Sequence, residues 1–158
     1  MAAQPSVPLD ETLKVRDACL CLHTQRAARV LARRFDEALK PAGLTNWQFS
    51  LLMALNGPRP SPMRDVAALL GVDRTTLTAT LKPLIRHGLA ETIGDPADRR
   101  LRRVRITAEG GERLARALPL WIASHGALEA ELDDLDPTGL RAGLNALAGR
   151  RPSQARAA

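Results

Sequence analysis

Tyrosine is absent from the sequence, and aromatic residues make up only 3% of its 158 positions. So few aromatic rings argue against a stacking platform for single-stranded nucleic acid. They also favour a helical protein rich in leucine and alanine over a β-sandwich. Two cysteines are too few for a disulfide scaffold. The composition therefore indicates a helical globular domain with a conventional apolar core.

Long apolar runs and catalytic motifs are missing as well. The longest uncharged run, residues 41–58, contains Gly, Asn and Gln, so it does not predict a membrane span. The first eight residues lack the basic and apolar pattern of a secretory signal. We find no Ser/His/Asp order, Gly-rich phosphate loop or metal cluster. We therefore expect a cytoplasmic protein that is not an enzyme, with no cofactor, no metal and no membrane partner.

Positive charge is concentrated in the middle of the chain. Residues 59–105 contain 10 Lys and Arg against 5 Asp and Glu, a net charge of +5. Residues 1–58 carry a net charge of +2 and residues 106–158 a net charge of −1, which completes the total of +6. Affinity for a polyanion grows with the number of phosphates neutralised. A local basic segment is therefore typical of a nucleic-acid-binding protein.

Apolar residues at helical spacing predict long helices at both ends. The first runs from Asp10, as N-cap, to about Lys40, and its length favours contact with a second subunit. A helical pattern resumes after Thr107, where Pro119 should kink or split the helix. Asp136-Pro137 opens a last helix. We expect these to be dimerisation helices, at 10–40 and 108–148, with tails at 1–9 and 149–158.

The segment between them, residues 45–107, combines three helices with a hairpin. Thr45 to Gln48 form a capping box that opens a helix ending near residues 56–57. Ser61-Pro62 is typical of an N-cap followed by a first helical proline, which predicts a short helix to Leu70. Gly71 ends that helix and Asp73 caps the next. Two short strands follow, at 89–93 and 102–106, joined by a basic loop.

This order of elements is a winged helix-turn-helix. The fold class is therefore mainly α with a small β-hairpin wing, flanked by N- and C-terminal dimerisation helices in one domain. A recognition helix needs short polar side chains to enter a major groove about 12 Å wide. The candidates are Arg74, Thr75, Thr76, Thr78, Thr80 and Lys82. At the hairpin, placed to straddle a minor groove, stand Arg99, Arg100, Arg102 and Arg103.

Two plainer interpretations remain for this region. One is a Thr-rich surface helix beside an exposed basic loop. The other is a winged helix that serves only as a protein–protein module, which predicts no salt-dependent affinity for DNA. The order of the elements and the local charge favour double-stranded DNA as the partner.

The sequence resembles the MarR (multiple antibiotic resistance regulator) family of bacterial transcription factors from Cys19 to about Gly111. The motifs that carry the resemblance are Gly43-Leu44-Thr45 with Gln48, residues 70–77, and residues 94–100 running on to Thr107. The resemblance implies a homodimer on a pseudopalindromic operator, acting as a repressor by family default. It further implies that Asp98 pairs with an arginine at the wing base and that Arg100 enters the minor groove. Pro83, inside the recognition helix, should bend that helix.

Family members are usually released from DNA by a small ligand or an oxidant, and the sequence supports two hypotheses. In the first, Arg26 or Arg29 holds a small aromatic acid or phenolate in a pocket with Trp47. Phe35, Phe49 and Met53 would line that pocket, although Phe49 and Met53 are better explained as core residues.

In the second hypothesis, Cys21 is a thiol sensor of organic hydroperoxides, with His23 or Arg26 favouring its thiolate. Against it, the tyrosines that flank the cysteine in the peroxide-sensing branch are replaced by Gln25, Phe35 and Asn46, so Cys21 is equally well explained as packing. A metal site at Cys19 and His23 would need further ligands, such as His125 from a partner chain.

Overall fold

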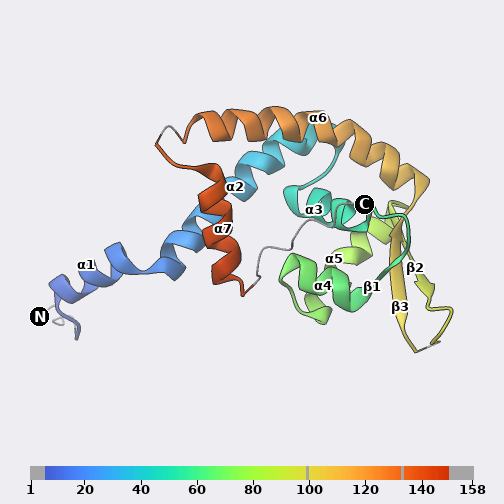
Figure 1. Cartoon of the computed structure of the whole chain (residues 1–158), viewed down its shortest axis with the longest axis horizontal. Coiled ribbons are helices and arrows are strands. Elements are labelled where there is room, and N and C mark those ends of the chain that lie inside the picture. The colour runs from blue at the N-terminus through green and yellow to red at the C-terminus, as the bar shows by residue number, and fades with distance from the viewer. Residues whose placement is uncertain (1–5, 99, 133, 150–158) are drawn as a thin grey trace, which may run out of the picture.

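The computed structural model describes residues 6–98, 100–132 and 134–149. Residues 1–5 and 150–158, which belong to the predicted tails at 1–9 and 149–158, lie outside these residues, as does Arg99. Figure 1 shows α6, the longest helix, along one edge of the molecule, with α2 beside it. The helices α3, α4 and α5 and a small sheet form a lobe below α6, and α1 projects away from the rest. The architecture confirms the predicted fold class.

The N-terminal segment forms two helices where the sequence predicts one. α1 spans Leu9–Ala18 and α2 spans Leu20–Leu39. Cys19 separates them with an extended backbone (φ −75°, ψ 100°), and its Sγ accepts a hydrogen bond from the Leu22 amide at 3.4 Å. Asp10 is not the N-cap either, because Pro8 holds that position. The cysteine therefore acts as the cap of a new helix, which apolar periodicity alone does not predict.

Between α2 and the lobe, local capping signals are confirmed. A short 3-10 helix, η1, spans Lys40–Ala42, and α3 spans Asn46–Leu55. Thr45 and Gln48 form the predicted capping box, with the Gln48 amide donating to Thr45 Oγ1 and the Thr45 amide donating to Gln48 Oε1. This box fixes the start of α3 and hence the entry into the lobe.

The sequence predicts Ser61 as the N-cap and Pro62 as the first helical residue, but both lie in the short strand β1, and Pro62 is itself the N-cap of α4. Ser61 pairs with Val104 and Pro62 with Arg103 in β3. α4 follows directly, over Met63–Leu70. The backbone of this dipeptide is extended because β3 offers it a partner more than 40 residues away, a contact that local sequence patterns do not reveal.

The rest of the lobe follows the predicted order. α5 spans Arg74–Arg86, β2 spans Ala90–Gly94 and β3 spans Arg102–Ile106. The three strands form an antiparallel sheet in the order β1-β3-β2. β3 thus pairs with β2, its partner in the wing hairpin, and with β1, the strand that precedes α4. This pairing joins the wing to the helix-turn-helix.

Two C-terminal helices complete the chain. α6 spans Ala108–Ala130 without a break, so Pro119 does not split it. α7 spans Pro137–Leu147 and is capped by Asp136 as predicted. Arg34 of α2 forms two hydrogen bonds, of 2.5 and 2.7 Å, to the carboxylate of Glu131 just beyond α6. This ion pair holds the two long helices together at the end remote from the wing.

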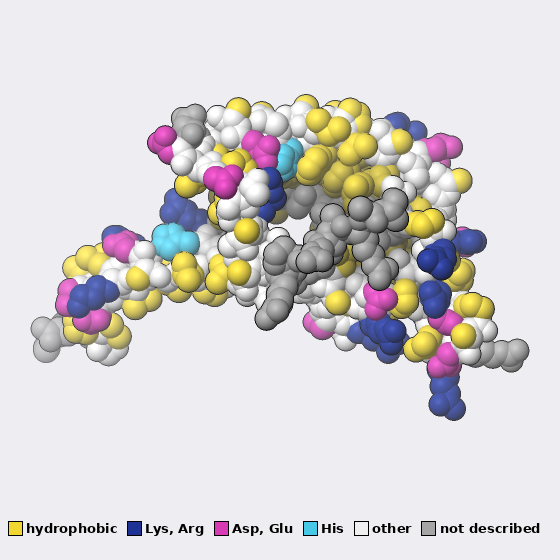
Figure 2. All heavy atoms as spheres, viewed as in Figure 1, with side chains coloured by type: hydrophobic (Ala, Val, Ile, Leu, Met, Phe, Trp, Pro, Cys, Tyr) yellow, Lys and Arg dark blue, Asp and Glu magenta, His cyan; other side chains and the backbone are white. Residues whose placement is uncertain are grey.

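The hydrophobic core lies inside the lobe and beneath α6. Its fully buried side chains include Leu39 of α2, Leu52 of α3, Leu77 and Leu84 of α5, and Val104 of β3. By contrast, α1 and α7 bury no residue, and hydrophobic side chains are exposed along α1 and below α6 (Figure 2). None of the helices in the described ranges has the length and hydropathy to cross a membrane.

Candidate nucleic-acid interface

The turn between α4 and α5 sets the direction of the recognition helix. Gly71 ends α4 in the left-handed conformation (φ +68°), which is unfavourable for residues with a side chain. Asp73 then caps α5, its carboxylate accepting from the Thr76 amide at 2.7 Å and from the Thr76 hydroxyl at 2.9 Å. Both hydrogen bonds lower the pKa of Asp73, and the one from the Thr76 amide has the larger effect. The cap therefore carries a stable negative charge at the positive end of α5.

α5 has one buried and one exposed face. Leu77, Leu81 and Leu84 anchor it in the core. On the exposed side, five residues line a shallow hollow of about 300 Å³: Arg74, Thr75, Thr78, Ala79 and Lys82. Four of the six recognition-helix residues predicted from sequence are therefore brought together on one surface.

Thr76 and Thr80 are used differently. The Thr76 hydroxyl is bound to Asp73, and the half-buried Thr80 hydroxyl donates to the carbonyls of Thr76 and Leu77 at 2.9 and 3.0 Å. Neither lines the hollow on α5. The Thr78 hydroxyl also donates within the helix, to the Arg74 carbonyl at 2.8 Å, so position is what separates these residues. Because Thr76 and Thr80 lie outside the hollow, we expect them to contribute less to DNA contact than the other four.

An ion pair at the base of the wing involves a different aspartate from the one that the family resemblance implies. Asp95 is 5% exposed in its side chain, and its Oδ2 accepts from Arg103 Nε at 2.5 Å. Its other oxygen accepts from the amides of Ala97 and Asp98, at 2.8 and 3.3 Å. The Ala97 amide, followed by the Arg103 guanidinium, lowers the pKa of Asp95. Asp98 itself is exposed and accepts the Arg100 amide at 2.9 Å.

The wing arginines therefore differ in their availability. Arg103 is occupied twice, because its Nη1 also donates to the Pro60 carbonyl at 3.1 Å. Arg105 pairs across the hairpin with Glu91 at 2.7 Å. Arg100 and Arg102 are exposed, and neither side chain has an ion-pair partner within the described residues. Arg100 and Arg102 are thus free to contact a ligand, while Arg103 supports the wing.

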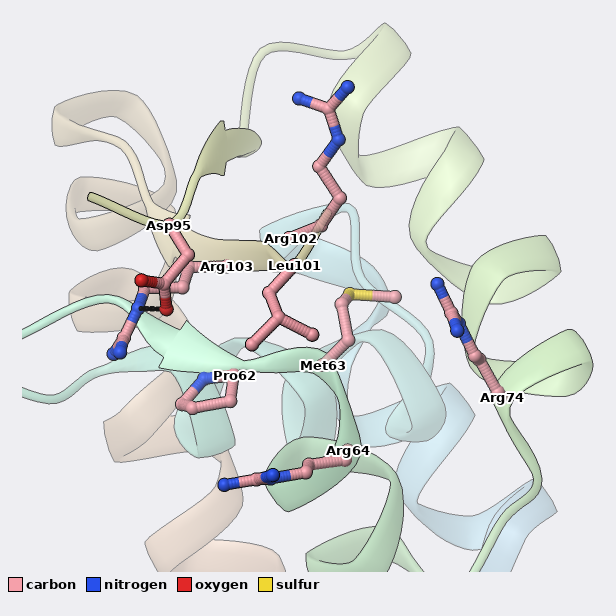
Figure 3. A pocket seen from close by; sticks show the side chains of 8 residues that line it. All are labelled: Pro62, Met63, Arg64, Arg74, Asp95, Leu101, Arg102 and Arg103. Atoms are coloured by element: carbon pink, nitrogen blue, oxygen red, sulfur yellow. Dashed lines mark hydrogen bonds and ion pairs between the residues drawn. The ribbon is translucent and has the colours of Figure 1, made fainter. Parts of the chain in front are cut away.

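A second hollow, of about 120 Å³, lies between α4, α5 and the wing (Figure 3). It brings Arg74 and Arg102 to the same place as Arg64, which sequence reasoning missed. Arg64 follows β1, and only the pairing of β1 with β3 carries it to the wing. The only signal in the sequence was its contribution to the central positive charge.

The residues predicted to sense an effector do not form one site. Arg26 and His23 line a hollow of about 410 Å³ between α2, α6 and α7. Arg29 lies within 3.5 Å of Gln25 on the exposed side of α2. Trp47 lines neither this hollow nor the apolar pocket of the lobe, and its indole nitrogen is buried without a partner among the described residues. Trp47 therefore does not share either of these two hollows with Arg26 or Arg29, and a common ligand site for these residues stays a prediction.

An apolar pocket of about 430 Å³ lies instead between α3, α4 and α6. It is lined by Phe49, Ser50, Met53, Ala54, Leu69, Leu70, Leu118 and Trp121. The rings of Phe49 and Trp121 stack with centroids 6.1 Å apart. Phe49 is a core residue, as expected. Met53 is 44% exposed and so does not belong to the core.

The cysteines stand at the junction of α1 and α2. Cys19 is half-buried at the helix break, and Cys21 is exposed in the first turn of α2. The Gln25 side-chain amide donates to Cys21 Sγ at 3.1 Å, whereas His23 Nε2 contacts the Asp17 carbonyl at 3.2 Å. Within the described ranges, no three His, Cys, Asp or Glu side chains gather as a metal site would require.

Comparisons with known proteins match this geometry. A family model described as a winged helix DNA-binding domain matches residues 44–110. The HTH-type transcriptional regulator BilQ of Clostridioides difficile is 29% identical over 101 residues, 64% of this chain and 68% of BilQ.

Two solved structures cover nearly the whole fold. The transcriptional regulator MosR of M. tuberculosis, in complex with DNA, is 39% identical over 83% of this chain and 94% of MosR, with a TM-score of 0.73. The transcriptional repressor CouR, bound to a 23-mer DNA duplex, is 28% identical over 85% of this chain and 93% of CouR, with a TM-score of 0.67.

Proposed function

The chain belongs to the MarR family of winged helix-turn-helix transcriptional regulators, and we propose that it acts in the cytoplasm as a homodimeric repressor of a pseudopalindromic operator. The observation that carries this proposal is the exposed surface of Arg74, Thr75, Thr78 and Lys82 beside Arg102 of the wing. Arginine and lysine are the side chains that most often read guanine, and threonine can contact either a base edge or a thymine methyl. The same helix is fixed in the core by three leucines, so the surface is rigid.

The free surfaces of the terminal helices support the dimer. Six apolar side chains are exposed on α1 and α7: Leu9, Leu13, Val15, Leu140, Leu144 and Leu147. A twofold axis through these helices would place two recognition helices about 34 Å apart, one turn of B-DNA. MosR and CouR, which have similar folds, are each solved in complex with DNA, which supports DNA as the partner.

The test is DNA binding by the purified protein with the DNA upstream of its own gene. Arg74→Ala should weaken the affinity by about tenfold or more, since it removes a charged contact. Arg116→Ala is the matched control, because Arg116 is an exposed arginine on α6, away from the interface. Equal affinities for the two variants would contradict the site. A salt-independent affinity of the unmodified protein would contradict the function.

For the effector, the apolar pocket between α3, α4 and α6 supports a small aromatic ligand. Among the described residues that line it, Ser50 has the only hydroxyl and none is charged, so a neutral phenol fits better than a carboxylate. A ligand there would lie between the lobe and α6. Titration with a series of phenols and benzoates, followed by Trp fluorescence and by release of DNA, tests this ligand preference. Met53→Trp should fill the pocket and abolish the ligand-induced release of DNA. Preferential release by carboxylates would contradict it.

A second candidate function, the thiol switch, is supported by the exposure of Cys21 and by its hydrogen bond from Gln25. That amide supplies a donor where the peroxide-sensing branch has tyrosine. In the reaction, the Cys21 thiolate attacks one oxygen of an organic hydroperoxide and the O–O bond breaks. Cys21 is oxidised to a sulfenic acid, and the hydroperoxide is reduced to an alcohol. Peroxide should release the DNA complex of the unmodified protein but not that of Cys21→Ser, whereas release of both would exclude Cys21.

A further inference from the structure

The hollow between α4, α5 and the wing combines an apolar floor with cationic edges. Met63 and Leu101 are the apolar side chains of the floor, together with Pro62. Figure 3 shows Arg64, Arg74 and Arg102 around it, each from a different element, with the Asp95–Arg103 ion pair at the remaining side. A surface of this kind suits an elongated ligand that alternates charged and apolar groups.

The net charge of the hollow is positive because only one of its arginines is paired with an acidic residue that also lines it. Four arginines and one aspartate line it, which gives a net charge of +3. Asp95 cancels the charge of Arg103, whose Nε and Nη1 are both already bonded. The remaining positive charge belongs to Arg64, Arg74 and Arg102.

Arg64 is available to a ligand. Its side chain is 81% exposed, and its ion pair is a 3.2 Å contact from Nε to the adjacent residue, Asp65. An exposed pair of this kind is worth little and can be exchanged for a stronger partner. The carboxylate of Asp65 is itself 59% exposed, so it can remain hydrated when Arg64 turns away.

We propose that this hollow binds the sugar-phosphate backbone of one DNA strand, with Arg64 and Arg102 each contacting a phosphate and Leu101 and Met63 packing against the deoxyribose between them. This inference rests on the proposed function and adds Arg64 and the apolar floor to the interface. The hollow is shallow, about 120 Å³, so a backbone strand can lie across it. Phosphate contacts set the register of a protein on DNA without reading its sequence.

Arg64→Ala should therefore weaken binding to the operator and to a scrambled duplex by the same factor, about tenfold. The slope of log affinity against log salt should become shallower by about one for each protomer that engages DNA. Arg116→Ala is again the control, with no change in affinity for either duplex. Leu101→Ser should weaken binding to both duplexes while leaving the salt slope unchanged, because it removes apolar contact and no charge.

Ethylation interference locates the contact. Ethylating the phosphate that Arg64 contacts should weaken binding of the unmodified protein by about the same factor, and should have no further effect on binding of Arg64→Ala. If Arg64→Ala behaves like Arg116→Ala while the unmodified protein still binds DNA in a salt-dependent way, this inference is overturned and the proposed function stands. If the unmodified protein binds neither duplex, the proposed function itself fails.

Discussion

At Gly110, in the first turn of α6, the chain passes so close to the end of α5 that no side chain fits. A Cβ at this position would lie 2.0 Å from the Leu89 carbonyl oxygen. The Thr107 hydroxyl joins the same two segments, donating to the Gly88 carbonyl at 2.5 Å and accepting from the Gly110 amide at 3.1 Å. This contact holds the lobe to the helix that leads to the partner.

We expect Gly110→Ala to lower the free energy of unfolding by about 3 kcal/mol, because backbone must move to admit the methyl group. Gly111→Ala is the matched control, because a Cβ added there would meet no other atom within 4 Å. Alanine is also more favourable than glycine in a helix interior, by about 0.5–1 kcal/mol. Urea unfolding at equal protein concentrations measures both. Equal stabilities of the two variants would contradict the close approach at Leu89.

The ionisation of Asp95 makes the stability of the folded protein depend on pH. Its pKa is lower in the folded protein than in the unfolded chain, so the fold favours the carboxylate. The resulting stabilisation is fully present above the ordinary carboxyl pKa, about 4, and is lost as the pH falls through the folded value.

Asp95→Asn should be less stable than the unmodified protein at neutral pH, and the difference between their melting temperatures should shrink below about pH 4. Asp98→Asn serves as control, because Asp98 is exposed and accepts one bond from the Arg100 amide. A difference that stays constant from neutral to acid pH would show that the Asp95 charge does not stabilise the wing.

Among the elements, α5, like α6 with Pro119, contains a residue that is unfavourable for its helical conformation. Pro83 lies inside the helix, and without an amide hydrogen it cannot bond the carbonyl of Ala79. The helix nevertheless continues to Arg86, because Leu81 and Leu84 on either side of the proline are buried. Packing thus overrides local propensity.

Replacing Pro83 by alanine should raise the free energy of unfolding by about 1 kcal/mol or more, since it restores a helical hydrogen bond. Lys82→Ala, at the exposed neighbouring position, should stay within about 0.5 kcal/mol of the unmodified protein. Chemical denaturation compares the two. A less stable Pro83→Ala would mean that the proline ring contributes more by packing than it costs in hydrogen bonding.

Elements with local signals could be predicted from the sequence, and those that depend on a distant partner could not. The capping box at Thr45 and the caps at Asp73 and Asp136 are confirmed because each involves residues within one turn. The strand at Ser61 was missed because its partner is Val104. The family resemblance implied Asp98 as the partner of an arginine at the wing base, whereas the structure pairs Asp95 with Arg103.

On the scale of the whole molecule, the exposed apolar faces of the terminal helices require a partner. Leu144→Glu should place a charge in the proposed dimer interface and give a monomer with at least tenfold weaker operator binding, because one half-site is lost. Sedimentation and DNA titration measure the two effects. Met53→Gln, which changes an exposed apolar residue of the lobe, should leave the protein dimeric. A dimeric Leu144→Glu would exclude α7 from the interface.

Because α6 is unbroken, it can transmit a movement from one of its ends to the other. Its 23 residues extend about 34 Å, from the base of the wing to the Arg34–Glu131 ion pair. Tilting a rod of this length by about 5° moves its far end by about 3 Å, close to the 3.4 Å step between stacked base pairs. Because the sheet fastens the wing to α4, the whole lobe would travel with that end. A small angular change at the subunit junction is therefore enough to move both recognition helices out of register with their half-sites.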